Sequence, residues 1–195
     1  LNIKTLGQGA PLVLLHGSGP GVSAWANWRL LLQGLGEGYR MIAPDLAGFG
    51  YTTAPEGTEF TRQMWLDQIV ALLDALGLER VHVIGNSFGG SMALALAIAC
   101  PARVERMVLM GSVGVPFELT EGLDAVWGYQ PSLENMRAIM KVFAFDHALI
   151  GDALVQLRHE ASIRPGIQEA FSSMFPAPRQ RWVDAMSHAE ADIRS

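Results

Sequence analysis

The stretch Val81-His-Val-Ile-Gly-Asn-Ser-Phe-Gly-Gly90 passes from apolar residues directly into glycines and a serine. Its first part, Val81–Ile84, is a short β-branched run of the kind that forms buried strands. The small residues of Gly89–Cys100 and the proline that follows them predict a helix. The G-x-S-x-G pattern centred on Ser87 therefore falls at a sharp turn from a strand into a helix.

This turn gives Ser87 a chemical role. A sharp strand-to-helix turn strains the backbone of its middle residue and projects the side chain from the carboxyl edge of the sheet. The glycines at positions 85 and 89 remove side chains that would clash. The Ser87 hydroxyl then lies at a helix N-terminus, where the Phe88 N–H can donate to a developing oxyanion. We interpret the turn as one that presents a nucleophile; the alternative is a chance loop of glycine and serine.

A second glycine-rich loop, His16-Gly-Ser-Gly-Pro-Gly21, follows the apolar run Leu12–Leu15. Such a loop can offer a second backbone N–H to the same oxyanion, near Ser18 or Gly19. A phosphate-binding loop is the alternative, but the loop has neither a G-K-[ST] ending nor G-x-G-x-x-G spacing. We expect His16 to brace this loop rather than to act as a catalytic base.

The first 112 residues alternate short apolar runs with helical patterns, which is typical of a parallel sheet in an α/β fold. We expect these strands to be buried on both faces. The predicted strands are Leu12–Leu15, Arg40–Ala43, Val81–Ile84 and Arg106–Met110, and the predicted helices are Arg62–Leu76 and Gly89–Cys100.

After Ser112 no further strand pattern occurs. Helices are expected over about 131–145, 152–163, 166–174 and 179–191. We predict three parts: residues 1–116 as the N-terminal part of an α/β core, 117–191 as a helical cap, and 192–195 as the start of a return to the core.

Composition excludes several classes of protein. Half of the residues are hydrophobic, 17% are charged and the net charge is −5, so a disordered chain or a nucleic-acid-binding protein is not expected. The longest apolar run, Met92–Cys100, is too short to span a bilayer. The single cysteine, Cys100, predicts a buried, inert thiol in a reducing, cytoplasmic setting.

Longer segments of the chain resemble one family. The likeness extends over nearly the whole sequence and is to the α/β-hydrolase superfamily and, within it, to the meta-cleavage product hydrolases, above all the 2-hydroxymuconate semialdehyde hydrolases. The segments that carry it are His16–Arg29, Ala43–Gly50, Gly85–Gly90, Thr120–Tyr129, Ala161–Gly166 and Met174–Trp182.

This resemblance implies a fold and a reaction. The fold is a mostly parallel sheet flanked by helices, with a helical cap. The reaction is hydrolysis of a carbon–carbon bond in a 2-hydroxy-6-oxo-dienoate formed in aromatic catabolism, with formate released from a semialdehyde. It uses no metal or organic cofactor. A small-molecule dienoate is the expected partner, and a homodimer is expected from the family alone.

The resemblance also implies roles for individual residues. Ser87 would be the nucleophile, and the N–H groups of Ser18 and Phe88 would form the oxyanion hole. The remaining candidates would contact substrate: amides that hold polar groups, a guanidinium that pairs with the carboxylate, and rings that line the apolar part of the pocket. They are Asn27, Asn86, Arg158, Phe143 and Trp127.

Each substrate-contacting candidate has a plainer alternative. Asn27 could cap a helix near Trp28, and position 86 could tolerate any residue. Arg158 could be a solvated helix charge, with Arg164 as the carboxylate partner instead. Phe143 and Trp127 could be ordinary core residues of the cap.

A base and an acid for Ser87 are not assigned. In this fold they follow the serine in the order acid, then histidine. The resemblance implies that they stand after the cap, on loops following two further core strands. We therefore expect residues 1–195 to be part of a longer enzyme whose C-terminal core strands are missing here. The candidates after Ser87 all fall in the predicted cap or at its end: His147, His159, His188, Asp124, Asp146, Asp152, Asp184 and Asp192.

Other readings remain open. A carboxylesterase shares the turn and the fold, and an inactive hydrolase-like binding protein is favoured by the unassigned base. A haloalkane dehalogenase is not expected, because its nucleophile is an aspartate where this chain has Ser87.

Overall fold

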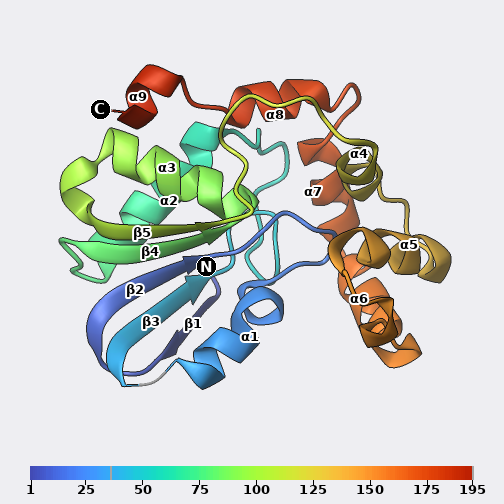
Figure 1. Ribbon diagram of the computed structural model, residues 1–195, viewed down its shortest axis with the longest axis horizontal. Coiled ribbons are helices and arrows are strands. Elements are labelled where there is room, and N and C mark those ends of the chain that lie inside the picture. Colours follow the sequence, from blue (N-terminus) through green and yellow to red (C-terminus); the bar gives the residue numbers. More distant parts are fainter. Residues whose placement is uncertain (36, 195) are drawn as a thin grey trace.

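The computed structural model describes residues 1–35 and 37–194 and contains a five-stranded sheet of order β1-β3-β2-β4-β5 (Figure 1). Within this sheet β1 runs antiparallel to its neighbour, and the other pairings are parallel. The strands are β1 (Ile3–Leu6), β2 (Gly9–Leu15), β3 (Gly38–Pro44), β4 (Val81–Asn86) and β5 (Val104–Met110).

The pairing of β2 with β4 sets the position of the two glycine-rich loops. These strands are parallel neighbours, with Leu12 opposite His82 and Leu15 opposite Gly85. Both therefore end at the same edge of the sheet, and the segments that follow them, 16–21 and 86–90, emerge side by side. Two motifs that are 70 residues apart in the chain are thus brought together by strand register alone.

Helices cover both faces of the sheet. Alternate side chains of β2 point to opposite faces: Leu12 and Leu14 belong to one buried cluster, Val13 and Leu15 to another. Helix α1 (Ala24–Gly34) packs on the first cluster, and helices α2 (Arg62–Ala75) and α3 (Phe88–Ala99) pack on the second.

The remaining helices lie largely beyond the carboxyl ends of the strands, as Figure 1 shows for α4 to α7, and α8 leads back toward α3, where the Ser91 hydroxyl donates to the Met186 carbonyl. Side-chain caps at Thr120 and Ser132 begin α4 and α5. These helices are α4 (Glu121–Trp127), α5 (Leu133–Phe143), α6 (Asp152–Ser162), α7 (Ile167–Met174), α8 (Gln180–Met186) and α9 (Glu190–Arg194), with short 3-10 turns η1 (Pro101–Arg103) and η2 (His147–Leu149).

The four predicted strands and the two helices predicted between them are confirmed, to within about two residues at most ends. Three elements were missed: β1, α1 and α4. Helix α1 does carry a signal, since the Ser23 side chain caps it and its buried residues recur every fourth position at Ala24, Trp28 and Leu32.

The predicted helix over 179–191 is wrong in its continuity. The helix is interrupted at 187–189, which separates α8 from α9. The interruption occurs because the backbone N–H of His188 donates to the Gly114 carbonyl at 2.8 Å. Of the predicted return segment, residues 192–194 belong to α9, and Ser195 lies outside the described residues.

Burial of every strand on both faces is also contradicted. In β5 the side chains of Val108, Leu109 and Met110 are 52%, 40% and 48% exposed. This strand is at the edge of the sheet among the described residues, so its outer side has no partner strand. Cys100 is likewise only partly buried, because it terminates α3 rather than lying within it.

No helix within residues 1–35 and 37–194 combines the length and the apolar character needed to cross a bilayer.

Candidate active site

Ser87 occupies the strained turn that the sequence predicts. Its backbone has φ 52° and ψ −114°, and it is the one non-glycine residue with positive φ in the part of the chain that the structure describes. It precedes the first turn of α3, yet its hydroxyl makes no capping hydrogen bond. The Ser87 N–H donates to the Met110 carbonyl at 2.9 Å, which fixes the turn against β5.

The glycines beside Ser87 are required by close packing. A Cβ at Gly89 would overlap the backbone oxygen of Leu15, and one at Gly85 would overlap the backbone of Gly89. The start of α3 therefore lies directly against the end of β2. This close approach puts the Ser87 turn beside the loop that follows β2.

Asn27 ties that loop to the turn. Its Oδ1 accepts a hydrogen bond from the Gly17 N–H at 3.0 Å and another from Asn86 Nδ2 at 2.9 Å. A Cβ placed on Gly17 would stand 3.5 Å from the Ser87 Cβ. The loop His16–Gly21, which we call the oxyanion loop after its expected role, thus meets Asn86 and α1 at one oxygen atom.

These contacts contradict the plainer alternative for Asn27 and weigh against the one for Asn86. Ser23, not Asn27, caps α1, through a hydrogen bond from the Ala26 N–H at 3.1 Å. Position 86 is not indifferent, because its amide holds Asn27. Direct contact of either amide with substrate stays a prediction.

His16 braces the oxyanion loop, as expected. The ring is completely buried, Nε2 accepts from the Leu46 N–H at 3.0 Å, and Nδ1 lies 2.8 Å from the Gly17 carbonyl. This pattern fixes the neutral tautomer with its proton on Nδ1. Burial lowers the pKa of His16, against the opposing effects of the Gly17 hydrogen bond and the Asp45 charge. Both ring nitrogens are occupied, so His16 has none free for Ser87.

Trp127 reaches the same loop from α4. Its indole Nε1–H donates to the Ser18 hydroxyl at 3.2 Å, although the side chain is only 2% exposed. The ring stacks on Phe175 with centroids 5.2 Å apart and meets Trp182 edge-on at 4.6 Å. Trp182 in turn lies 5.9 Å from Phe88. Trp127 therefore packs as a core residue and at the same time connects α4 to the oxyanion loop.

Arg158 points from α6 toward the oxyanion loop. Its Nη2 donates to the Pro20 carbonyl at 3.3 Å and lies 3.8 Å from where a Gly19 Cβ would stand. Burial lowers the pKa of Arg158, and the neighbouring Arg29 charge lowers it further. Among the described residues Arg158 takes part in no ion pair. It is therefore not a solvated surface charge, and it has no carboxylate partner within this region.

Phe143 does not join this group, contrary to the prediction. It is 64% exposed at the end of α5. Helical spacing places it on the face of the buried Met136 and Ile139, but residues 141–143 are all exposed, since the packing that covers α5 does not reach its last turn. Arg164, the alternative carboxylate partner, stands elsewhere: its Nη2 donates to the Gly50 carbonyl at 2.7 Å.

No histidine ring is hydrogen-bonded to the Ser87 hydroxyl within the described residues. The rings of His159 and His188 are held at the Tyr129 hydroxyl, 3.2 Å, and at the Ser91 carbonyl, 3.2 Å. His147 is exposed and faces the Lys141 carbonyl. His82 lies on the sheet, 3.9 Å from Glu105.

The fold and the serine turn together define a class of protein. A family model described as the alpha/beta hydrolase fold matches residues 10–193. The chain belongs to this family. Its relatives narrow the assignment to the meta-cleavage product hydrolases, as two curated proteins and two solved structures show.

The curated relatives are similar over nearly the whole of this chain. A 2-hydroxy-6-oxo-2,4-heptadienoate hydrolase of Pseudomonas putida is 58% identical, covering 99% of this chain and 70% of the relative. A 2-hydroxymuconate semialdehyde hydrolase of a Pseudomonas species is 57% identical, covering 100% of this chain and 69% of the relative. The chain thus spans about 70% of the length of these proteins.

Solved structures support the same family assignment. A variant of the meta-cleavage product hydrolase CumD superposes with a TM-score of 0.98 at 55% identity, covering 100% of this chain and 72% of that one. A second CumD structure, from Pseudomonas fluorescens and complexed with acetates, also has a TM-score of 0.98, at 54% identity, and this chain covers 71% of it.

Proposed function

We propose that this chain carries the nucleophile, the oxyanion hole and the carboxylate site of a hydrolase that cleaves a carbon–carbon bond in 2-hydroxymuconate semialdehyde or a related 2-hydroxy-6-oxo-dienoate. The main observation behind this proposal is that the strained Ser87 turn lies against the oxyanion loop, which Asn27 holds in position by hydrogen bonds. The relatives at 57% and 58% identity, named for such substrates, support the choice of substrate class.

The chemistry needs an electrophilic carbonyl beside a bond that can break. The dienol is first ketonised, with a proton added at C5. Oxygen from water or from Ser87 then adds to the C6 carbonyl, and the oxyanion that forms is stabilised by the N–H groups of Phe88 and Ser18. The C5–C6 bond breaks, its electron pair is delocalised onto the 2-oxo group, and overall one water is consumed to give a dienol acid and a short carboxylic acid.

Arg158 suits the anionic end of such a substrate. It is a partly buried guanidinium beside the oxyanion loop without an ion-pair partner among the described residues, and a carboxylate would supply that partner through two parallel hydrogen bonds. An ester substrate of a carboxylesterase would leave this charge uncompensated. Asn27 and Asn86 would bind the polar groups nearer the reacting carbonyl, and Trp127 would form part of the apolar wall.

A helical cap over residues 117–191 is part of this proposal. Helices α4 to α7 lie beyond the carboxyl ends of the strands (Figure 1). Ser87 directly follows the end of β4, and these helices contribute Trp127 and Arg158. Closing such a site excludes water and strengthens its hydrogen bonds to substrate.

The proton acceptor for Ser87 does not come from the histidines described above. A serine hydroxyl is a weak nucleophile without an adjacent base, so the proposed activity requires a base outside this group. The activity is therefore to be measured on the full gene product.

The test follows the yellow ring-fission product by its absorbance. The full gene product should bleach 2-hydroxymuconate semialdehyde with release of formate, and Ser87→Ala should stop formate release while binding persists. Wild-type formate release by Ser87→Ala would disprove the role of the serine. Hydrolysis of simple neutral esters with no effect on the dienoate would favour a carboxylesterase, and tight binding without turnover by the unmodified protein would favour a binding protein.

The group attached to C6 is left to the same assay, because a methyl ketone would release acetate in place of formate. We also infer a homodimer, which size-exclusion chromatography with light scattering tests, and a cytoplasmic location, which cell fractionation tests.

A further inference from the structure

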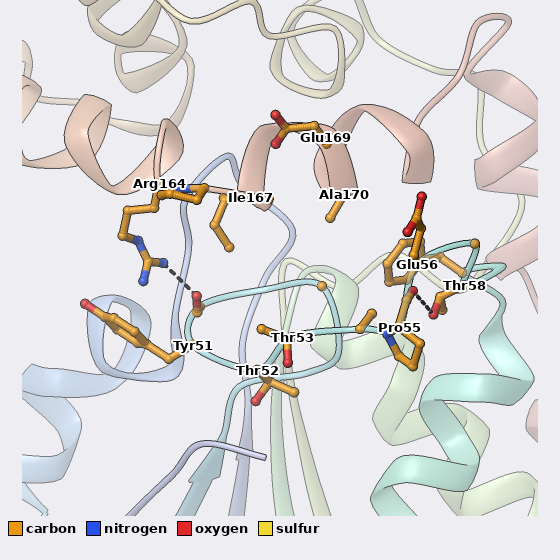
Figure 2. A pocket seen from close by; sticks show the side chains of 17 residues that line it. Tyr51, Thr52, Thr53, Pro55, Glu56, Thr58, Arg164, Ile167, Glu169 and Ala170 are labelled. Carbon is orange, nitrogen blue, oxygen red and sulfur yellow. Dashed lines mark hydrogen bonds between the residues drawn. The ribbon is translucent and has the colours of Figure 1, made fainter.

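A cavity of about 620 Å³ lies between the loop after β3 and the start of α7 (Figure 2). Its floor is the segment 50–58, and its roof is the segment 164–170. None of the residues assigned to the Ser87 site lines it. The volume is within the range of small-molecule sites, which is about 300–1,000 Å³.

The cavity has one positive group at one end. The guanidinium carbon of Arg164 stands 4.0 Å from the centre of the Tyr51 ring, and Nη2 donates to the Gly50 carbonyl at 2.7 Å. In a third contact, Arg164 Nε donates to the Ala161 carbonyl at 3.3 Å, which fixes the Nε side of the guanidinium. These contacts orient the guanidinium, and in the described part of the chain Nη1 has no hydrogen-bond partner and Arg164 has no ion-pair partner.

The rest of the lining is mostly apolar. Figure 2 shows Ile167 and Ala170 reaching from α7 toward the opposite loop, which contributes Thr53 and Pro55. Tyr51 is 67% exposed despite its contact with Arg164. An oriented cation next to open apolar walls fits a small planar molecule with one carboxylate.

Two carboxylates near the cavity could repel an anionic ligand. Glu56 and Glu169 also line the cavity, but both are exposed. Glu169 extends from the side of α7 away from the Thr52–Pro55 loop (Figure 2). Neither is within ion-pair distance of Arg164, so they do not neutralise it. Water screens their repulsion of an anion, because both are at the rim.

We propose that this cavity is a second binding site for conjugated carboxylates, separate from Ser87, in which Arg164 binds the carboxylate and the surfaces of Tyr51, Ile167 and Ala170 cover the planar chain. That the bound carboxylate is the dienoate substrate or its dienol acid product rests on the proposed function. The binding itself does not, because Arg164 and the cavity exist independently of the chemistry at Ser87.

The experiment uses the full gene product with Ser87→Ala, titrated with sorbate (2,4-hexadienoate), a stable planar carboxylate, and followed by calorimetry and by the NMR signals of Ile167 and Ala170. Two sites are expected. Arg164→Gln should weaken binding at the cavity about tenfold or more, the size of one charge-assisted contact, and Arg158→Gln should weaken the other site. The neutral alcohol that corresponds to sorbate should not bind in the cavity.

Arg181→Gln, which removes an exposed charge from α8, is the matched control and should change neither site.

Arg164 also joins α6–α7 to the loop after β3, so its loss could loosen the structure. Ala170→Phe fills the cavity and leaves Arg164 in place, and it should abolish the second site without lowering the melting temperature. Sorbate binding that is unchanged by both Arg164→Gln and Ala170→Phe would overturn the proposal. Binding in the cavity by a protein that fails to cleave dienoates would disprove the proposed function alone.

Discussion

Asn27 and Asn86 share a single hydrogen bond, 2.9 Å from Asn86 Nδ2 to Asn27 Oδ1, and the same oxygen accepts the Gly17 N–H at 3.0 Å. Asn27 is on α1, Asn86 ends β4, and Gly17 follows β2. One oxygen atom therefore sets the position of the oxyanion loop relative to the Ser87 turn. This relationship gives Asn27 a positioning role that is separate from any contact with substrate.

Two substitutions separate these roles. Asn27→Leu removes the oxygen, frees the Gly17 N–H and shifts the oxyanion loop, so we expect kcat to fall by roughly 10²-fold or more, the effect of losing one oxyanion donor. Asn27→Asp keeps an oxygen for both donors and loses the amide N–H. We expect it to retain more of kcat than Asn27→Leu but to raise KM, because it places a negative charge where an anionic substrate binds.

Steady-state kinetics of dienoate cleavage by the full gene product measures both variants. Equal kcat values for the wild type and Asn27→Leu would show that the loop does not depend on this oxygen.

The sequence shows residue types at this site but not their connections. Asn27 was singled out from a family likeness, and the alternative cap was reasonable because asparagine favours that position. The pairing of β2 with β4 brings Gly17 close to Asn86, and the packing of α1 on the sheet adds Asn27 to the same point. By contrast, the Ser87 turn was predictable, since its strand, its glycines and its helix are consecutive in the chain.

The prediction for Phe143, which rests on the family resemblance, is wrong because of the extent of packing along α5. Phe143 is on the same face of α5 as Ile139, yet it is 64% exposed and Ile139 5%. The apolar pattern of β5 similarly predicts burial that depends on neighbours on both sides. A sequence pattern gives the face of an element, whereas the length over which that face is covered is set by the elements packed against it.

Gly89 tests the close packing of α3 on β2. Gly89→Ala would place a methyl group on the backbone oxygen of Leu15, which cannot move without breaking the sheet. We expect a loss of several kcal/mol in the free energy of unfolding or failure to fold, as for other changes that overpack a core. Denaturant unfolding measures this loss.

The control for this substitution is Gly34→Ala. Gly34 is in the last turn of α1, and nothing lies within 4 Å of the position that an added methyl group would occupy, so alanine there should leave stability unchanged or raise it slightly. A Gly89→Ala protein as stable as Gly34→Ala would contradict the close approach of helix and strand.

His16 makes stability depend on pH. Burial lowers its pKa below the 6.5 of an exposed imidazole, so the folded protein keeps the ring neutral while the unfolded chain takes up a proton. Its contribution is therefore fully present above pH 6.5 and is lost as the pH falls from there toward the folded-state pKa. The slope contributed by one proton cannot exceed about 1.4 kcal/mol per pH unit.

Urea unfolding of the wild type and His16→Gln, from about one pH unit above the pKa of an exposed imidazole to below it, measures this effect. At the upper end the variant should be less stable, because the Leu46 N–H loses its acceptor, and its stability should depend less steeply on pH. The same slope in both proteins would show that another group is responsible.

Arg158 is expected to act on binding rather than on the chemical step. Arg158→Gln should raise KM for the dienoate about tenfold or more and change kcat less, because the lost contact is made to the carboxylate in ground state and transition state alike. Arg158→Lys keeps the charge but not the planar fork and should recover only part of the affinity. Arg137→Gln, which removes an exposed pair with Asp152, should change neither constant. An unchanged KM in Arg158→Gln would assign the carboxylate to another residue.

Trp127 offers a way to test whether α4 affects the oxyanion loop through its indole N–H. Trp127→Phe keeps an aromatic ring against Phe175 and Trp182 but removes the donor to the Ser18 hydroxyl. We expect a loss of stability of about 1 to 3 kcal/mol from the smaller ring and the lost hydrogen bond.

Ser18→Ala in the wild-type background removes the same hydrogen bond from the other side. If the bond positions the Ser18 N–H, the two variants should lower kcat by similar factors and the double variant by no more than either alone. Multiplied losses in the double variant would show that the ring and the hydroxyl act separately.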